Sequence, residues 1–323
     1  MNNNAVINEI RHDINSFNFF VDNNVNVIDS AELEIRHTCF LIIYKLSNGQ
    51  ELYVKILKYK NIDGNSLYES TKDENSREIG QREYQSYSWF LESIKSEDLS
   101  VYTLPILTYL EKWNAIVSFK LDAEDLYYSL RKSTSTDELY RIGRWLRRVH
   151  LAMETENKLV TSPNEYCHNL YEDLVDRLKS SFTPMQLTYS VGLTDFDCRD
   201  ILINKHKLYC LDLCMTKKLE PQLHTVGKFI AGIELLYWGT KSFTFNQVPR
   251  ILINSFIEGY FKDYSNGDLL AQKKAINWFT IQSLLRHSWQ VSQRSSKFYK
   301  IYNSAIGRPY LKKILNKYYF STL

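Results

Sequence analysis

The sequence predicts an α+β protein with two lobes: a small β-rich N-terminal lobe and a larger, mostly helical C-terminal lobe. Strand-like apolar runs concentrate in the first 121 residues. From residue 135 onward the apolar spacing is helical, apart from one short strand pair. Because strands and helices occupy separate stretches of the chain, the pattern indicates α+β rather than alternating α/β. We place the boundary between residues 1–119 and 120–323.

The predicted N-terminal lobe begins with a β-hairpin. Two apolar runs, 38–46 and 51–57, flank Ser47-Asn48-Gly49-Gln50, a sequence typical of a tight turn. The polar stretch 60–75 contains Gly and Asn residues that interrupt any period, so we expect it to be a loop.

A helix and two strands are expected to complete this lobe. Apolar residues recur at helical spacing over about 76–96. Shorter strand-like runs follow at 101–110 and 114–121. The strand signal fades after residue 121, close to the lobe boundary between residues 119 and 120.

Helices dominate the predicted C-terminal lobe. Ser135 and Glu138 have the spacing of a capping box, and a helical pattern follows to His150, for which we expect a structural role. Another helix is expected over 165–181. A strand pair is predicted at 201–204 and 207–212, and the pattern is helical again from residue 225.

The composition indicates a soluble protein with its own apolar core. The chain has 323 residues, of which 44% are hydrophobic and 24% charged. These fractions exclude disordered and disulfide-rich secreted classes. Five cysteines lie among apolar neighbours, and the N-terminus is polar. We therefore expect reduced thiols, no signal peptide and a cytoplasmic location.

The charge is distributed unevenly along the chain. The first 268 residues hold 30 basic and 37 acidic groups, a net of −7, whereas the remainder holds ten basic groups and no acidic one. The basic segment is compatible with an anionic ligand, with an anionic membrane or glycolipid surface, or with docking on the acidic body. No base-reading motif accompanies it, so no specific nucleic-acid partner is predicted.

Three aspartates surround the predicted strand pair at residue 205. Asp195 and Asp200 precede it, five residues apart, and Asp212 ends its second strand. Phosphoryl transfer uses carboxylates in two roles: one orients the attacking hydroxyl and others hold Mg²⁺ on nucleotide phosphates. Asp197 is a rival to Asp195 but lacks the five-residue step. Asp212 interrupts an apolar run, where a carboxylate needs a cation or several donors.

Lys55 is the cation that the acidic residues require. It lies within an apolar strand, where a lysine either extends its ammonium to solvent or has a partner. Glu83, in the following helix, is the candidate partner, and Glu78 is its rival. A strand lysine paired with a helix glutamate positions the lysine on nucleotide phosphates in kinase folds.

The order Lys55, Glu83, Asp195, Asp200 and Asp212 resembles the protein-kinase-like superfamily, and within it the aminoglycoside-phosphotransferase and lipopolysaccharide (Kdo/heptose) kinase branches. The resemblance spans about residues 30–260. It implies a protein-kinase-like fold and an ATP- and Mg²⁺-dependent kinase that phosphorylates a hydroxyl of a small molecule or glycan, such as an aminoglycoside or a lipopolysaccharide sugar.

The resemblance also assigns roles to the residues. Asp195 matches the catalytic base, and Asp200 and Asp212 match the metal-binding positions. Lys55 matches the phosphate-binding lysine and Glu83 its ion-pair partner. The backbone near Ser118, Phe119 and Lys120 is expected to receive the adenine of ATP.

Three departures from the family pattern leave an alternative open. Leu193 replaces a histidine, Asp200 replaces an asparagine, and the stretch 30–37 stands in the place of the glycine-rich loop without one glycine. Glycine-rich loops cradle phosphates with backbone N–H groups. The alternative is therefore a catalytically degenerate kinase-like protein that binds a nucleotide or a protein partner.

Overall fold

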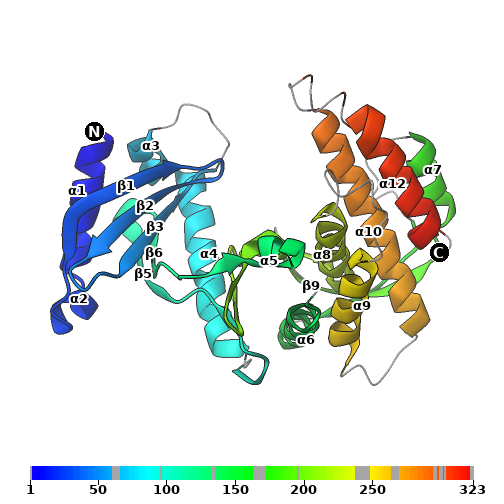
Figure 1. Cartoon of the computed structure of the whole chain (residues 1–323), viewed down its shortest axis with the longest axis horizontal. Helices are drawn as coiled ribbons and strands as arrows, with labels where there is room; N and C mark the ends of the chain where they lie inside the picture. Colours follow the sequence, from blue (N-terminus) through cyan, green and yellow to red (C-terminus); the bar gives the residue numbers. More distant parts are fainter. Residues whose placement is uncertain are drawn as a thin grey trace. The chain divides into compact units, whose positions relative to one another are not determined.

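The computed structural model describes residues 2–59, 66–94, 97–132, 135–153, 155–162, 172–194, 196–236, 248–262, 269–293, 297, 301 and 303–320. The chain forms two compact units, which are described one at a time (Figure 1). The first comprises Met1–Ser93, Thr103–Ala123 and Leu211–Met215, and the second comprises Ile94–Tyr102, Glu124–Cys210 and Thr216–Leu323. The expected α+β class is confirmed, since the N-terminal half is β-rich and the C-terminal part is helical.

The first unit is built on a five-stranded sheet of order β1-β2-β3-β6-β5, whose neighbouring strands all pair antiparallel. The strands are β1 (Val27–Ile35), β2 (Cys39–Leu46), β3 (Glu51–Leu57), β5 (Ile106–Leu110) and β6 (Ala115–Phe119). The predicted hairpin of β2 and β3 is confirmed, and its turn contains Gly49 at φ 83°, a conformation that glycine adopts without strain.

The single strand expected at 101–110 is wrong. The chain forms two short strands there, β4 (Val101–Thr103) and β5, and they belong to different sheets. Leu104 and Pro105 separate them. Proline has no backbone N–H to give to a sheet, and it restricts the residue before it, so the strand is interrupted at this point.

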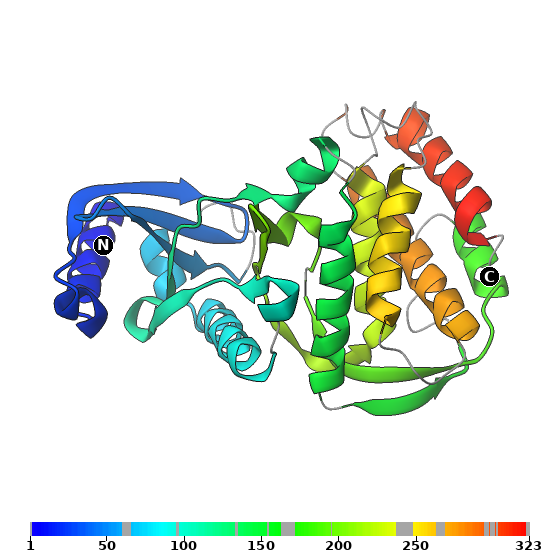
Figure 2. The same ribbon diagram turned by 60° about the horizontal axis from the view of Figure 1, so that its bottom comes forward.

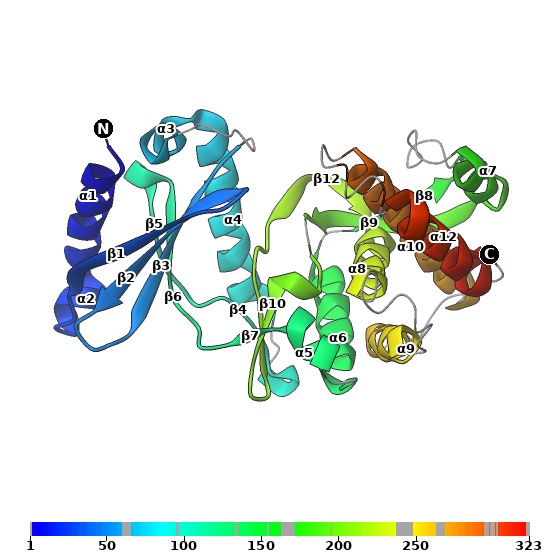
Figure 3. The ribbon, with the colours of Figure 1, turned by 45° about the horizontal axis from the view of Figure 1, so that its top comes forward.

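Helices cover the first sheet. They are α1 (Asn3–Asn15), α2 (Asn18–Asp22), α3 (Leu67–Lys72), α4 (Glu74–Ser93) and the 3-10 turn η2 (Glu111–Trp113). Figure 3 shows α1 beside the strands, and its buried Val6, Ile10 and Ile14 belong to the same apolar core as the sheet residues. These three residues lie four apart, on one face of the helix.

Two parts of this arrangement differ from the sequence expectation. The helix α1 was not anticipated, because the apolar residues of its buried face stand among many polar ones. The loop expected at 60–75 is wrong for its second part: Ser66 and Glu69 form a capping box that begins α3. Residues 60–65 lie outside the described part of the chain.

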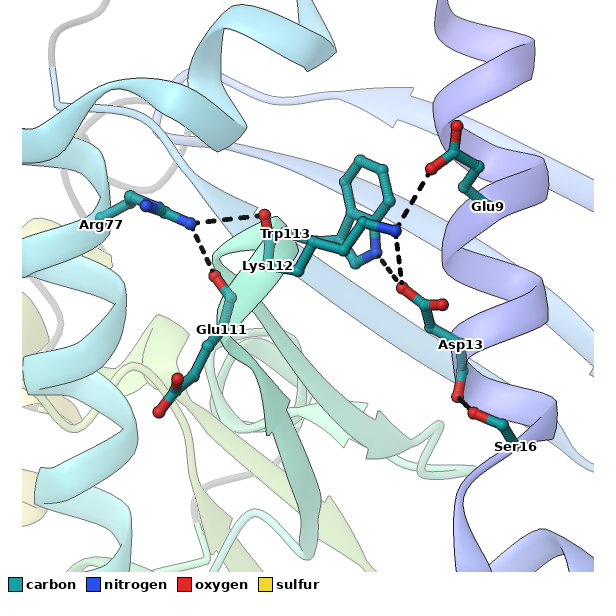
Figure 4. A network of polar contacts seen from close by, with 7 residues as sticks. All are labelled: Glu9, Asp13, Ser16, Arg77, Glu111, Lys112 and Trp113. Atoms are coloured by element: carbon teal, nitrogen blue, oxygen red, sulfur yellow. Dashed lines mark hydrogen bonds and ion pairs between the residues drawn. The ribbon is translucent and has the colours of Figure 1, made fainter.

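A polar network joins α1, η2 and α4 (Figure 4). The Trp113 indole N–H donates to the Asp13 carboxylate at 2.6 Å, and the Lys112 ammonium contacts Asp13 at 3.4 Å and Glu9 at 3.3 Å. Arg77 of α4 donates to the backbone carbonyl of Glu111 at 3.0 Å. These contacts hold η2 between the two helices.

The second unit contains two smaller sheets. One has the order β4-β11-β10-β7, with β11 (Lys207–Cys210), β10 (Ile201–Asn204) and β7 (Glu124–Asp125). The predicted strand pair near residue 205 is confirmed as the hairpin of β10 and β11. The other sheet has the order β12-β9-β8, with β12 (Met215–Pro221), β9 (Met185–Leu193) and β8 (Glu156–Val160), and was not predicted.

The helices of the second unit pack into a bundle, seen in Figure 2 from green α6 through yellow α9 to red α12. They are η1 (Glu97–Leu99), α5 (Leu126–Lys132), α6 (Asp137–Ala152), α7 (Glu172–Ser180), η4 (Cys198–Asp200), α8 (Gln222–Leu236), α9 (Val248–Phe261), α10 (Leu269–Ser292), η6 (Asn303–Gly307), α12 (Arg308–Ile314) and η7 (Leu315–Tyr319). Among the described residues, no helix is both long and apolar enough to cross a membrane.

Two helix predictions need correction or restriction. The capping box at Ser135 is wrong in its detail: α6 begins at Asp137 after Thr136, and the Ser135 hydroxyl contacts the Glu138 side chain instead of a backbone N–H. Of the helix expected over 165–181, the structure shows the part from Glu172 onward as α7. Residues 163–171 lie outside the described part.

His150 of α6 has the structural role expected for it. Its side chain is buried, and its Nδ1 lies 2.8 Å from the hydroxyl of Tyr260 on α9. Burial lowers the pKa of His150 to about 3, and Arg147 nearby adds to the decrease. The imidazole is therefore neutral in the folded chain at neutral pH.

We expect this histidine to make folding pH-dependent. The unfolded chain protonates His150 below its ordinary pKa, whereas the folded chain does not, so stability is full above pH 6.5 and is lost as the pH falls toward 3. Between pH 7.5 and 5.5 the loss is about 1 kcal/mol. Urea unfolding of the wild type and of His150→Gln at both pH values measures it. An equal pH dependence in the two proteins would contradict the assignment.

Candidate active site

A partly buried ion-pair cluster in the first unit joins Lys55, Glu83 and Asp212. Lys55 lies on β3 between β2 and β6, opposite Leu41 and Ile116. Its ammonium lies 2.9 Å from Glu83 Oε1 and 2.5 Å from Asp212 Oδ1. The exposed fractions of the side chains are 19% for Lys55, 5% for Glu83 and 54% for Asp212. The ammonium thus has two carboxylate partners, one buried and one that reaches solvent.

The pKa values in this cluster follow from two carboxylates sharing one ammonium. Burial lowers the pKa of Lys55, but Glu83 and Asp212 more than offset it, so the pKa is raised well above its ordinary value. Burial raises the pKa of Glu83 and outweighs the opposite effect of Lys55. Lys55 therefore stays charged at every physiological pH.

The backbone around Asp212 is held in an unusual conformation. Asp212 follows β11 and has φ 49°, in the left-handed region that non-glycine residues rarely adopt. Such conformations cost free energy and persist where surrounding contacts enforce them, often at functional sites. Its carbonyl accepts a hydrogen bond from the Cys214 N–H at 2.9 Å.

Helix α4 contacts the two residues that follow shortly after Asp212. The Ser86 hydroxyl accepts from the Met215 N–H at 3.0 Å, and Arg82 Nε donates to Cys214 Sγ at 3.4 Å. One helix thus holds Glu83 and also the segment that carries Asp212. The sequence analysis did not single out Ser86 and Arg82 as site residues. Their positions, four residues apart on the helix that carries Glu83, place them close together on that helix.

In the second unit, the segment between β9 and β10 carries the other two acidic positions. Asp195 lies outside the described residues. Asp197 caps the short turn η4 by accepting from the Arg199 N–H at 2.6 Å, and Asp200 Oδ2 accepts from the Asp197 N–H at 3.1 Å. Phe196 stacks on Phe229 of α8, with ring centroids 5.2 Å apart.

Asp197 has a second contact besides its role at the start of η4. Its carboxylate also forms an ion pair with the guanidinium of Arg199. The geometry therefore gives Asp197 a structural role, and Asp195 keeps the catalytic role predicted from the sequence as a proposal.

Carboxylates suited to Mg²⁺ are present in both units. Asp212 uses Oδ1 for Lys55 and is half exposed, and Asp200 lies at the start of β10. Within the described ranges, no three His, Cys, Asp or Glu side chains gather to hold a metal by themselves. Mg²⁺ is commonly held by one or two carboxylates together with substrate phosphates. Asp200 and Asp212 each offer carboxylate oxygens of the kind that Mg²⁺ takes, and their joint binding of a metal stays a prediction.

The residues expected near adenine lie at the end of β6. Ser118 is buried and pairs with Tyr53 and Ile106. The backbone N–H of Lys120 donates to the Glu51 carbonyl at 2.9 Å, so this donor is already used within the sheet. For Ser118, Phe119 and Lys120, contact with adenine stays a prediction.

The connection between β1 and β2 consists of Arg36, His37 and Thr38. The stretch 30–37 stands where the related kinases have a glycine-rich loop. Most of it belongs to strand β1. The ammonium of Lys58 donates to the Arg36 carbonyl at 2.8 Å. This short connection contains no glycine.

No model of a known protein family matches the chain, and no curated protein matches it. Solved structures do. A choline/ethanolamine kinase family protein from Mesorhizobium loti has a TM-score of 0.55 at 12% identity, covering 98% of this chain and 97% of its own. Macrolide 2'-phosphotransferase type I has a TM-score of 0.52 at 7% identity, covering 90% and 94%. The amicoumacin kinase hAmiN, solved with AMP-PNP, Ca²⁺ and Ami, has a TM-score of 0.51 at 12% identity, covering 90% and 89%.

The chain thus has the protein-kinase-like fold, in the form that these kinases and phosphotransferases share. The fold expected from the order of Lys55, Glu83 and the aspartates is confirmed. At these identities the similarity establishes the fold alone.

Proposed function

We propose that the protein is an ATP- and Mg²⁺-dependent phosphotransferase that phosphorylates a hydroxyl group of a small molecule or glycan. The observation that carries this proposal is the partly buried ammonium of Lys55 between the buried Glu83 and the exposed Asp212. A buried cation of this kind is costly unless it serves a purpose. In a protein-kinase-like fold, that purpose is to hold nucleotide phosphates.

Each residue has a definite part in this proposal. Lys55 binds the α- and β-phosphates of ATP, and Glu83 positions its ammonium. Asp200 and Asp212 hold Mg²⁺, which neutralises charge on the phosphates during transfer. In this scheme residues 1–119 bind the nucleotide, with the adenine near Ser118–Lys120, and residues 120–323 carry the acidic residues and the acceptor.

Asp195 acts on the acceptor. Its carboxylate orients the attacking hydroxyl and receives the proton of that hydroxyl as the bond to phosphorus forms. The bond from the γ-phosphorus to the oxygen of ADP breaks, and ADP leaves. Asp197 supports this segment through its contacts with Arg199.

Two observations bear on the class of acceptor: the resemblance of the sequence to known families and the similarity of the fold to solved structures. The similar structures include an enzyme named for macrolides and an amicoumacin kinase that was solved in complex with Ami. The sequence resemblance adds aminoglycosides and lipopolysaccharide sugars. We propose an acceptor of this kind, a hydroxyl-rich small molecule or glycan.

One observation favours a second candidate, a degenerate kinase-like protein that binds nucleotide without turnover. The β1–β2 connection of three residues offers no glycine backbone for the phosphates. In this case the ion-pair cluster is retained for nucleotide binding alone.

Two measurements on the intact chain separate the candidates. Thermal shift with ATP, with and without Mg²⁺, reports binding, and mass spectrometry of aminoglycosides, amino alcohols and sugars incubated with ATP reports transfer of one phosphate. We expect Mg²⁺-dependent binding and a phosphorylated product. Binding without ADP release or product supports the second candidate, and absence of nucleotide binding contradicts both.

A further inference from the structure

A cavity of about 310 Å³ lies within the second unit, where the ends of α6 and α9, the starts of α8 and α10 and the strands β8 and β9 meet. In Figure 2 the two green strands pass beneath the ends of α6 and α9. One water needs about 10–15 Å³ of cavity volume, so there is room for roughly two dozen water-sized groups. This is about the size of a disaccharide.

A buried glutamine forms part of the floor of this cavity. Gln222, at the start of α8, lines the cavity and is 5% exposed. Its Nε2 donates to the backbone carbonyl of His150 at 2.9 Å, which is its one hydrogen bond to the described part of the chain. Its side-chain carbonyl oxygen thus remains as an acceptor. Because a buried polar atom without a partner costs free energy, a ligand that donates to this oxygen is favoured.

The imidazole of His150 is the second buried polar group of the floor. It also lines the cavity, and its Nδ1 lies 2.8 Å from the Tyr260 hydroxyl. The other ring nitrogen, Nε2, has no hydrogen bond to the described residues. A neutral imidazole has one nitrogen that donates and one that accepts. The ring therefore offers a hydrogen-bonding atom without bringing a charge to the floor.

The rim of the cavity is polar as well. Thr155 and Asn157 are exposed, and Thr188 of β9 is half-buried. The Thr188 hydroxyl donates to Asn157 Oδ1 at 2.9 Å, which orients the amide and leaves its N–H groups as donors. Floor and rim together offer donors and acceptors. Hydroxyl groups match such a lining, because each of them both donates and accepts.

Apolar side chains form the walls. They are Leu151, Leu223, Tyr260 and Phe261, and the last two have ring centroids 5.2 Å apart in edge contact. Ligand pockets commonly combine apolar walls with a small number of polar groups that fix the orientation of the ligand. The C–H face of a sugar ring fits walls of this kind, while its hydroxyls meet the floor and the rim.

Charge excludes one class of ligand. Among the described lining residues there is no Asp or Glu, and Arg147 is the one cation. Its guanidinium carbon lies 5.7 Å from the Tyr260 ring centroid, and it has further interactions within the chain. A ligand ammonium would meet a cation and no carboxylate, so a protonated amino sugar fits poorly. A guanidinium already engaged with the protein gives an anion little advantage over a neutral ligand.

The cavity is separate from the segment that carries the proposed phosphoryl-transfer residues. A Cβ atom added at Gly232 of α8 would lie 3.3 Å from Asp197 Cβ, so α8 packs on that segment at Gly232. Gln222 precedes Gly232 by ten residues, which is about 15 Å along the helix axis. The cavity therefore lies at the other end of α8.

We propose that this cavity binds a neutral, hydroxyl-rich ligand of the size of one or two sugar rings. Gln222 and His150 bind its hydroxyls at the floor, Asn157 and Thr188 bind them at the rim, and Tyr260 packs on its carbon atoms. The ligand is either part of the acceptor of the proposed reaction or a glycan that is not phosphorylated, and the experiment separates these sources.

Saturation-transfer NMR of the intact protein tests the proposal, because it detects weak binding from the protons of the ligand. Maltose and glucose are the neutral probes, glucosamine at pH 6 is the cationic probe and glucuronate is the anionic probe. We expect saturable binding of maltose, weaker binding of glucose, and binding of neither charged probe more tightly than glucose.

Two variants assign the binding to this cavity. Asn157→Ala/Thr188→Ala is expected to raise the Kd for maltose about tenfold, because it removes hydrogen-bonding groups of ordinary strength at two positions of the rim. Gln222→Met is expected to raise it at least as much. Since Gln222 also donates to the His150 carbonyl, urea unfolding of this variant is measured, and the rim variant decides the test if Gln222→Met does not fold.

Thr183→Ala/Gln186→Ala is the matched control. It removes one hydroxyl and one amide from exposed positions at and beside β9 that do not line the cavity, and we expect it to bind maltose as the wild type does. Failure of maltose to bind, tighter binding of glucosamine or glucuronate than of glucose, or equal weakening in the control and the rim variant overturns the proposal.

These results do not depend on the proposed enzymatic function, because the NMR titration needs no ATP. Mass spectrometry of maltose after incubation with ATP and Mg²⁺ separates the two sources of ligand. A gain of one phosphate identifies a glycan acceptor, and binding without a gain identifies a glycan that the protein binds but does not phosphorylate.

Discussion

Replacing Asp195 by Asn is expected to lower kcat for phosphoryl transfer about 10³-fold, within the range that general-base catalysis contributes. The amide keeps the size of the side chain but cannot take the proton of the acceptor hydroxyl. Binding of ATP is expected to change little, because Lys55 and the metal-binding carboxylates remain. Steady-state kinetics with the acceptor found by screening, together with nucleotide titration, measures both effects.

Asp197→Asn is the matched control for this change. Asp197 caps η4 and pairs with Arg199, so its replacement is expected to cost about 1 kcal/mol of stability and to leave kcat within about tenfold of wild type. If Asp197→Asn abolished turnover and Asp195→Asn did not, the assignment of the base would be reversed.

Replacing Lys55 by Met is expected to lower kcat/KM for ATP about 10²- to 10³-fold. Removal of a single group that stabilises charge in the transition state has an effect of this size in other enzymes. Lys55→Arg is not expected to restore it, because the planar guanidinium does not fit the two carboxylate contacts made by the ammonium. Initial rates at varied ATP concentration measure the loss.

The same substitution also affects folding, and this effect can be separated. Without the ammonium, Glu83 is a buried carboxylate that has lost the cation it paired with. We expect this loss to lower the free energy of unfolding by about 3 kcal/mol. Burial already raises the pKa of Glu83, and removal of Lys55 raises it further. The variant is therefore most stable below the ordinary pKa of glutamate and loses stability as the pH rises through the raised value.

A double variant provides the control. Lys55→Met/Glu83→Leu removes both buried charges and is expected to regain most of the stability while turnover stays low. Urea unfolding and ATP turnover on the same samples report the two effects. Recovery of turnover in the double variant would show that Lys55 serves folding only.

The sequence predicted the parts of the site that depend on local pattern. A lysine within the apolar run 51–57 needs a partner, and Glu83 on the next predicted helix is that partner. The hairpin of β10 and β11, which precedes Asp212, followed from the alternation of apolar residues. These features are determined by short-range chemistry, which one sequence displays.

Features that depend on tertiary contacts could not be predicted in this way. The left-handed backbone at Asp212 is followed by a segment that contacts Ser86 and Arg82, which are distant in sequence. Pairing of Arg308 with Asp173 likewise joins residues that no local pattern links.

Diffraction from crystals grown with AMP-PNP and Mn²⁺ tests the central claim most directly, because Mn²⁺ takes the place of Mg²⁺ and is located by its anomalous signal. The account predicts Mn²⁺ bound by the carboxylates of Asp200 and Asp212 and by the nucleotide phosphates, with the Lys55 ammonium on the α- and β-phosphates. A nucleotide that binds with its phosphates away from Lys55, or a Mn²⁺ ion held by neither aspartate, would contradict it.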